Sequence, residues 1–134
     1  MAKKLDTKLK IESWDEKPYR ELPDGSKFTK ADITLGGDGK GIESAGFEAL
    51  MHYTPDGKSV YLSLMRIEGE LDGRKGGFVL EGRGTFDGTT ARSSYAVIEG
   101  SGTGELAGIS GKGESASTHN DYPNMPFTLT YDVT

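Results

Sequence analysis

The sequence predicts an all-β protein that forms one closed antiparallel barrel of about eight strands. Three observations predict this fold. Apolar and polar residues alternate with a period of two in most runs, tight-turn signals separate these runs, and no window shows the apolar stripe of a helix. The chain has 134 residues, 20 of them glycine, without a low-complexity tract, which is typical of many tight turns and small strand positions. This length fits a single domain, residues 1–134, with one core.

Composition limits the classes of function. The formal net charge of -5 argues against nucleic acid as a partner, because phosphate binding needs a concentrated basic surface. Cysteine is absent, so no disulfide, thiolate nucleophile or cysteine-ligated zinc is expected, and a reducing cytoplasm is the expected location. No apolar run reaches the roughly 18 residues of a membrane span, and residues 1–5 are not typical of a signal peptide, so no membrane partner is expected.

The N-terminal part predicts two strands joined by a long loop. Residues 5–14 alternate, with one apolar side that ends at Ser13 and with Trp14 on the polar side. Residues 16–26 contain two prolines and an Asp-Gly pair, which predicts a loop that folds over the mouth of the barrel. A second strand is expected over residues 27–35.

Three tight turns set the predicted register of the next four strands. Pro55-Asp56-Gly57 is typical of a three-residue hairpin loop, and Asp72-Gly73 and Asp87-Gly88 are typical of two-residue type I′ loops. These turns predict the following cross-strand pairs: Met51 with Tyr61, Phe47 with Met65, Ile67 with Phe78, Phe86 with Thr89, Gly84 with Ala91, and Leu80 with Tyr95.

The register divides these strands into two faces. The predicted interior face carries rings and aliphatic groups: Phe47, Met51, Tyr53, Tyr61, Met65, Ile67, Phe78, Leu80, Phe86, Tyr95 and Val97. The opposite face is charged and mixed with aliphatic residues: Glu48, His52, Arg66, Glu68, Glu81, Arg83 and Arg92, with Leu50, Leu62, Leu64 and Val79. Because side chains alternate along a strand, a one-residue error in a turn would exchange the two faces.

The interior face supplies a candidate ligand-binding site. Small residues at positions 82, 84, 91 and 93 lie beside large rings and would leave space at one end of the barrel. The expected ligand is small and apolar or aromatic, with tyrosine hydroxyls as polar contacts. The alternative is that loops or Trp14 fill this space. The candidate ligand-binding residues are Tyr53, Tyr61, Met65, Gly82, Phe86, Ser93 and Tyr95.

Cofactor and metal signals are absent. The glycine-rich runs at residues 36–41 and 100–108 lack the strand and helix that a phosphate-binding loop needs, so turns and a short helical turn at residues 104–106 are expected. His52 has only His119 as a second imidazole, in a remote loop, so we predict no metal site. Residues 119–122 are interpreted as a turn stabilised by Asn and Asp side chains, with a polar cluster at the barrel mouth as the alternative.

Four segments carry a recognisable pattern: SWDEKPY at 13–19, GRKGGFVLE at 73–81, GTF at 84–86 and GSGTGELAG at 100–108. In these segments the chain resembles a domain-of-unknown-function family of small bacterial proteins. The similarity extends along nearly the whole chain, and the family is associated with an allene oxide cyclase-like barrel, a relative of lipocalin-like folds. The resemblance therefore implies this architecture, but it implies no established activity. Many members have Glu in place of Met65 and His in place of Gly82, so an acid-base pair of that kind is absent here.

Three functions are compatible with these observations. The leading hypothesis is a barrel that binds a small apolar or aromatic molecule. The second is an isomerase or cyclase that uses an inward carboxylate or a tyrosine, with Glu114 as the general base if burial raises its pKa; other catalytic residues are unknown. The third is a structural homo-oligomer without a ligand, because Leu50, Leu62, Leu64 and Val79 are too many for a solvated exterior.

Overall fold

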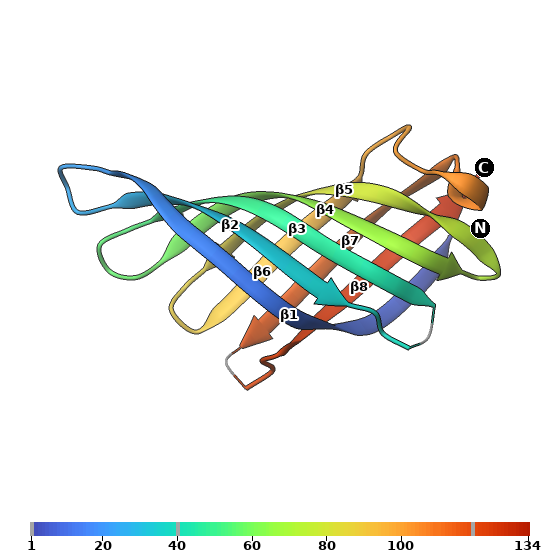
Figure 1. Ribbon diagram of the computed structural model, residues 1–134, viewed down its shortest axis with the longest axis horizontal. Helices are drawn as coiled ribbons and strands as arrows, with labels where there is room; N and C mark the ends of the chain where they lie inside the picture. Colours follow the sequence, from blue (N-terminus) through green and yellow to red (C-terminus); the bar gives the residue numbers. More distant parts are fainter. Residues whose placement is uncertain (1, 40, 119) are drawn as a thin grey trace.

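The computed structural model describes residues 2–39, 41–118 and 120–134. Eight antiparallel strands, each paired with the next, form one sheet that closes on itself because β8 pairs with β1 (Figure 1). The strands are β1 (Lys3–Glu21), β2 (Lys27–Gly36), β3 (Ile42–Tyr53), β4 (Ser59–Leu71), β5 (Arg74–Phe86), β6 (Thr90–Val97), β7 (Ile109–Thr118) and β8 (Asn124–Val133). One 3-10 turn, η1 (Gly104–Leu106), lies between β6 and β7, as predicted. The all-β, antiparallel prediction is confirmed.

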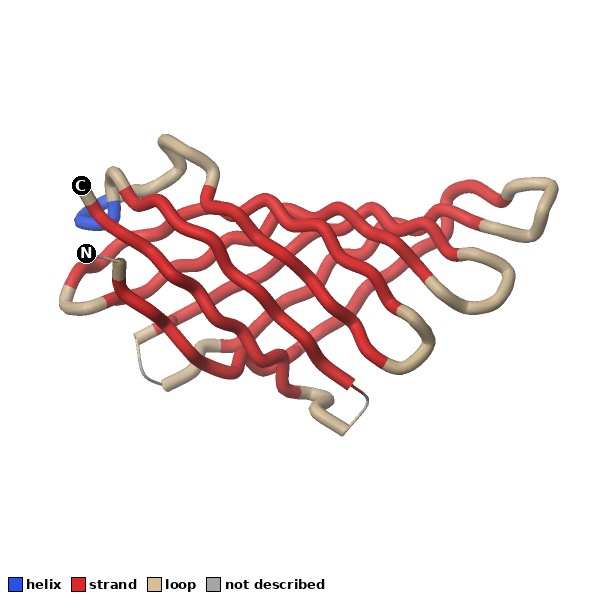
Figure 2. Tube along the Cα trace, turned by 180° about the vertical axis from the view of Figure 1, so that it is seen from behind, coloured by secondary structure: helices blue, strands red, loops and turns tan. Residues whose placement is uncertain are grey.

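The connections lie at two ends of the closed sheet (Figure 2). One end carries both chain termini and η1, together with the links from β2 to β3 and from β4 to β5. The other end carries the turns that follow β1, β3, β5 and β7, and we call it the hairpin end. The hairpin of β1 and β2 projects furthest there, as Figure 1 shows in blue.

The packed core fills the end that carries the termini. Leu9, Met65, Leu80 and Phe127 are fully buried in this core. Leu106 of η1 belongs to the same cluster and is 1% exposed, so this short turn helps to close the interior at that end. Any open interior space therefore lies toward the hairpin end.

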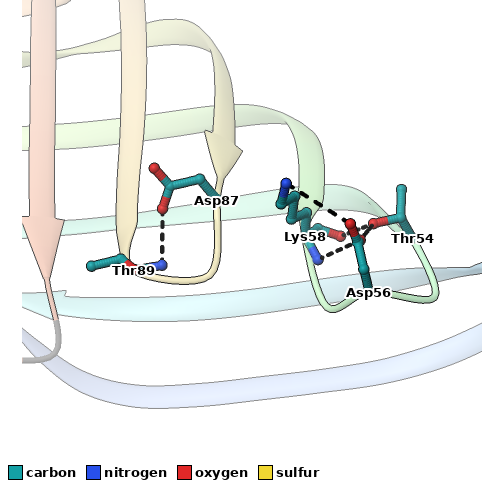
Figure 3. A network of polar contacts seen from close by, with 5 residues as sticks. All are labelled: Thr54, Asp56, Lys58, Asp87 and Thr89. Atoms are coloured by element: carbon teal, nitrogen blue, oxygen red, sulfur yellow. Dashed lines mark hydrogen bonds and ion pairs between the residues drawn. The ribbon is translucent and has the colours of Figure 1, made fainter.

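The first two predicted hairpins are confirmed. The Thr54 amide donates to the Lys58 carbonyl at 2.8 Å, which closes the predicted three-residue loop. The carboxylate of Asp56 also accepts hydrogen bonds from the Thr54 hydroxyl and from the Lys58 amide (Figure 3). In the second turn both loop residues have positive φ, 51° at Asp72 and 80° at Gly73, as a type I′ turn requires. The cross-strand pairs predicted from these two turns are found in the sheet.

The prediction for the third hairpin is wrong: the turn lies one residue later in the chain, which shifts the pairing of β5 with β6 by two residues. The Asp87 amide donates to the Thr90 carbonyl at 3.3 Å, so Gly88 and Thr89 form the turn in place of Asp87-Gly88. The carboxylate of Asp87 accepts a hydrogen bond of 2.8 Å from the amide of Thr89 (Figure 3). It accepts a second one, also of 2.8 Å, from the amide of Thr90, and the two bonds stabilise this turn.

The corrected register moves each partner on β6 by two residues. Phe86 therefore pairs with Ala91 and Leu80 pairs with Val97. A shift of two keeps every side chain on its face, because the side-chain period of a strand is two. The predicted interior residues are accordingly buried or half-buried, whereas Arg66 is exposed on the opposite face.

The predicted loop over residues 16–26 is wrong, because β1 continues to Glu21. Glu12 has no partner in the pairing of β1 with β2, so the strand has a β-bulge at this residue. The register shifts a second time between Pro18 and Arg20. The bulge at Glu12 reverses the alternation. Trp14 and Glu16 consequently lie on the interior side, opposite the buried residues of β2.

Candidate functional site

The interior at the hairpin end contains a cavity of about 290 Å³. An apolar cavity of roughly 150 Å³ can hold benzene, so this one has room for a larger aromatic molecule. One part of its lining consists of aromatic rings: Trp14, Phe47, Tyr53, Tyr61, Phe86 and Tyr95. Another part consists of hydroxyl groups on β6 and β7: Ser93, Ser115, Ser117 and Thr118.

The strands part beside the cavity. β1 pairs with β8 only from Lys3 to Lys10, and the pairs between β7 and β8 end at Glu114 and Thr128. The cavity is lined beyond these points by Met125 on β8 and by Tyr122, which is 65% exposed. This parting gives the cavity a mouth at the hairpin end.

Trp14 lies at this mouth and does not fill the cavity. Its side chain is 47% exposed, and its ring stands edge-on to Phe47 with the ring centroids 6.5 Å apart. The alternative in which Trp14 occupies the space therefore differs from the structure.

The structure brings most of the predicted binding residues together. Tyr53, Tyr61, Phe86, Ser93 and Tyr95 all line the cavity. The predicted positions Met65 and Gly82 do not. Met65 is fully buried in the packed core, away from the open half.

Two tyrosine rings occupy the space that was expected beside the glycines. A Cβ atom on Gly82 would lie 2.7 Å from Cε1 of Tyr95, and one on Gly84 would overlap the ring of Tyr61. These glycines are therefore covered by aromatic rings and do not create the cavity. The open space lies beside Ala91, further toward the hairpin end.

The phenols inside the cavity stay protonated. Tyr61 and Ser93 share a hydrogen bond of 2.8 Å between their hydroxyl oxygens. Burial raises the pKa of Tyr95 to about 12, although a hydrogen bond with Ser93 offsets part of this effect. Burial also raises the pKa of Tyr61. These hydroxyls can donate and accept hydrogen bonds, but they are poor proton donors to a substrate at neutral pH.

Glu16 is the interior carboxylate that the sequence did not predict. Its Oε2 atom accepts hydrogen bonds from the hydroxyl of Tyr53 at 2.7 Å and from the hydroxyl of Thr29 at 2.8 Å. Its Oε1 atom accepts one from Nε1 of Trp14 at 2.9 Å. A one-residue slip in the alternation after residue 11 is the only sequence signal for this placement.

The environment of Glu16 favours its charged form. Burial raises its pKa, but the hydrogen bonds from Tyr53, Trp14 and Thr29 and the charge of Lys27 together lower the pKa below its usual value. Burial and the bond to Glu16 raise the pKa of Tyr53 well above that of a free tyrosine. The pKa of Glu16 is thus shifted further below neutral pH, and the pKa of Tyr53 is shifted further above it.

Glu114 does not meet the condition for a general base. It is exposed on the outer face of β7, while its neighbours Gly113 and Ser115 are buried. Strand alternation therefore directs this carboxylate away from the cavity.

The histidines do not contribute to the cavity within the described structure. His52 is half-buried on the outer face, with its ring 5.3 Å from that of Phe28. His119 lies outside the described residues. The Asp121 carboxylate accepts a hydrogen bond from the Thr118 amide at 2.8 Å, which agrees with the predicted turn.

Among the residues that the structure describes, no group of His, Cys, Asp and Glu side chains could hold a metal ion. Within the same residues, no helix has the length and apolar character to cross a membrane.

Comparisons with known proteins identify the family. The model of a family described as protein of unknown function (DUF3224) matches residues 6–131. The fold is similar to the crystal structure of a DUF3224 protein with unknown function from Shewanella oneidensis MR-1, with a TM-score of 0.68 and 23% identity over 100% of this chain and 99% of that chain. A search of curated proteins found no match. Since the family model covers nearly the whole sequence, this chain belongs to the DUF3224 family of proteins of unknown function.

Proposed function

We propose that this protein binds a small, uncharged, apolar or aromatic molecule in the cavity at the hairpin end. The observation that carries the proposal is the lining. Aromatic rings and hydroxyl groups converge on about 290 Å³ of space, and none of the described lining residues is charged. Pockets for small molecules are typically apolar, with a few placed polar groups.

The arrangement of the lining supports a flat ligand with one polar group. Aromatic rings from β1, β3 and β4 favour an aromatic or alicyclic body, and the serine hydroxyls of β6 and β7 can bond to a hydroxyl or carbonyl group. A ligand that buries about 200 Å² of apolar surface gains about 5 kcal/mol, part of which offsets the cost of association. A gain of about 5 kcal/mol corresponds to a dissociation constant of about 0.2 mM, so we expect weak binding, with dissociation constants from about 0.1 mM to a few mM.

The proposal includes membership of the allene oxide cyclase-like or lipocalin-like class of barrels. Its support is the sequential order of eight antiparallel strands around an interior that is packed at one end and hollow at the other. A cytoplasmic location is also part of the proposal and is supported by the absence of cysteine.

Binding receives more support than acid-base catalysis. Isomerase or cyclase chemistry needs a group whose pKa lies near the working pH. The pKa of Glu16 is lowered and that of Tyr53 is raised, so neither group is suited to exchange protons at neutral pH.

The test is a ligand panel measured by thermal shift and by the emission of Trp14, the only tryptophan in the chain. We expect uncharged aromatic compounds to raise the melting temperature and to change the emission, and charged analogues to have smaller effects. Ser115→Leu would fill the cavity and should abolish both responses. Ala116→Leu is the matched control, because Ala116 is the exposed neighbour on β7. A panel without any response would contradict the proposal, as would equal responses from the two variants.

A further inference from the structure

We infer that the outer face of β3, β4 and β5 is the interface of a homodimer whose two-fold axis crosses the strands. The inference is independent of the proposed function, because this face is on the side of the sheet opposite the cavity lining. Its centre is formed by Leu50, Leu62 and Leu64, and we call it the leucine face.

The leucine face exposes a contiguous apolar surface. Leu50 and Leu62 are direct neighbours across β3 and β4, and Leu64 is the next outward residue on β4. Their exposed fractions are 52%, 57% and 57%, respectively. Apolar groups gathered at one spot on a surface are typical of protein interfaces, whereas single exposed leucines are not.

The charges around the leucines lie in two adjacent rows across the strands. In the first row, Lys30 is the neighbour of Leu50 and Arg83 is the neighbour of Leu62. In the second row, Leu64 lies between two glutamates, Glu48 on β3 and Glu81 on β5.

The second row continues to an acidic residue on β2, since Asp32 pairs with Glu48. From β2 to β5 the row through Leu62 is thus basic and the row through Leu64 is acidic. On β7 the signs are exchanged, with Glu114 in the first row and Lys112 in the second, so an acidic residue still lies beside a basic one. The described ion pairs, Lys3 with Asp72 and Lys58 with Asp56, involve none of these groups.

This pattern selects a second copy of the chain and one orientation for it. A two-fold axis that crosses the strands between the rows places the basic row of one copy on the acidic row of the other. Leu62 then contacts Leu64 of the second copy, and Arg83 faces Glu81 of that copy. An axis along the strands would instead place basic residues on basic residues, which is unfavourable. In the selected arrangement each contact occurs twice, as a two-fold interface requires.

The shape of the face agrees with this arrangement. Outward residues from β2 to β7, including Lys30, Leu62, Ser94 and Lys112, line one open groove. The small side chains of Ser94 and Ala96 on β6 keep this surface low beside the leucines. A second copy can therefore approach over several strands.

Cysteine cross-linking tests the axis directly, because the chain contains no cysteine. Chains with Leu62→Cys and chains with Leu64→Cys are mixed and oxidised. We expect mixed disulfide-linked dimers to form at least threefold faster than dimers of either variant with itself, since the axis brings position 62 to position 64. Faster linkage of like variants would overturn the proposed axis.

Charge reversal gives a second test by sedimentation equilibrium. Arg83→Glu and Glu81→Arg should each raise the dimer dissociation constant about tenfold, and the double variant should restore it, because both contacts are then reversed together. Lys8→Glu, on the exposed surface of β1, is the control and should leave the constant unchanged. Circular dichroism verifies that each variant is folded. A monomeric wild-type chain at micromolar concentration, or a double variant as weak as the single ones, would overturn the inference.

Discussion

The hydroxyl of Tyr53 donates a 2.7 Å hydrogen bond to the carboxylate of Glu16 and so links β3 to β1 across β2. Thr29 of β2 donates to the same carboxylate oxygen, so three consecutive strands meet at one atom. The ammonium group of Lys27 lies 5.3 Å from the centre of the Tyr53 ring and adds a positive charge nearby. This cluster holds the projecting hairpin of β1 and β2 against the mouth of the cavity.

The first prediction concerns the pH dependence of this cluster. The pKa of Glu16 is lower in the folded chain than its usual value of 4.5, so the ionised form stabilises the fold. The wild-type chain should be more stable than Glu16→Gln by about 1 kcal/mol at neutral pH. This advantage should decrease as the pH falls below 4.5 and be lost once Glu16 is protonated in the folded chain. Urea unfolding at a series of pH values measures it, and a difference that does not vary with pH would contradict the prediction.

The second prediction isolates the bond between Tyr53 and Glu16. In a double-mutant cycle with Tyr53→Phe and Glu16→Ala, we expect a coupling free energy of about 1 kcal/mol, because the two side chains share one hydrogen bond. The same cycle with Tyr61→Phe is the control, since Tyr61 bonds to Ser93 instead. Equal coupling in the two cycles would show that the effect is not specific to this bond.

The sequence predicts most of the register but not all of it. Pro55-Asp56-Gly57 and Asp72-Gly73 determine their turns locally, because residues with positive φ occur where the turn types require them. The pair Asp87-Gly88 does not determine its turn uniquely, because the turn can include Asp87 or begin after it. Its aspartate acts through its side chain at the first position of the turn, not through its backbone within the loop.

The interior site is predictable only in part, for two physical reasons. The bulge at Glu12 is an irregularity in the pairing of β1 with β2, which strict alternation does not predict, and it directs Trp14 and Glu16 inward. The filled volume over Gly84 depends on the side-chain conformation of Tyr61, which belongs to the neighbouring strand. Alternation gives the face of a residue correctly, whereas the position of empty space depends on how large side chains pack.

The third prediction tests the third turn. Asp87→Asn removes the charge of a carboxylate. Hydrogen bonds from the amides of Thr90 and Thr89 lower the pKa of this group, so its ionised form stabilises the turn. We expect a lower melting temperature at neutral pH and no difference from the wild type in acid, where Asp87 is protonated. Asp15→Asn, an exposed carboxylate on β1, is the control for the loss of one charge. Melting curves that coincide at neutral pH would contradict the role assigned to Asp87.

The last prediction concerns the tyrosine rings that cover the glycines of β5. In Gly84→Ala the new methyl group overlaps the ring of Tyr61, which must move toward the cavity, so we expect a loss of about 1–3 kcal/mol of stability. The loss should be much smaller when the same change is made in a Tyr61→Ala background, because the ring is then absent. Denaturant unfolding of the four chains measures this non-additivity. If Gly84→Ala costs the same in both backgrounds, the ring of Tyr61 does not occupy the space above Gly84, and the cavity extends further toward the core than the structure indicates.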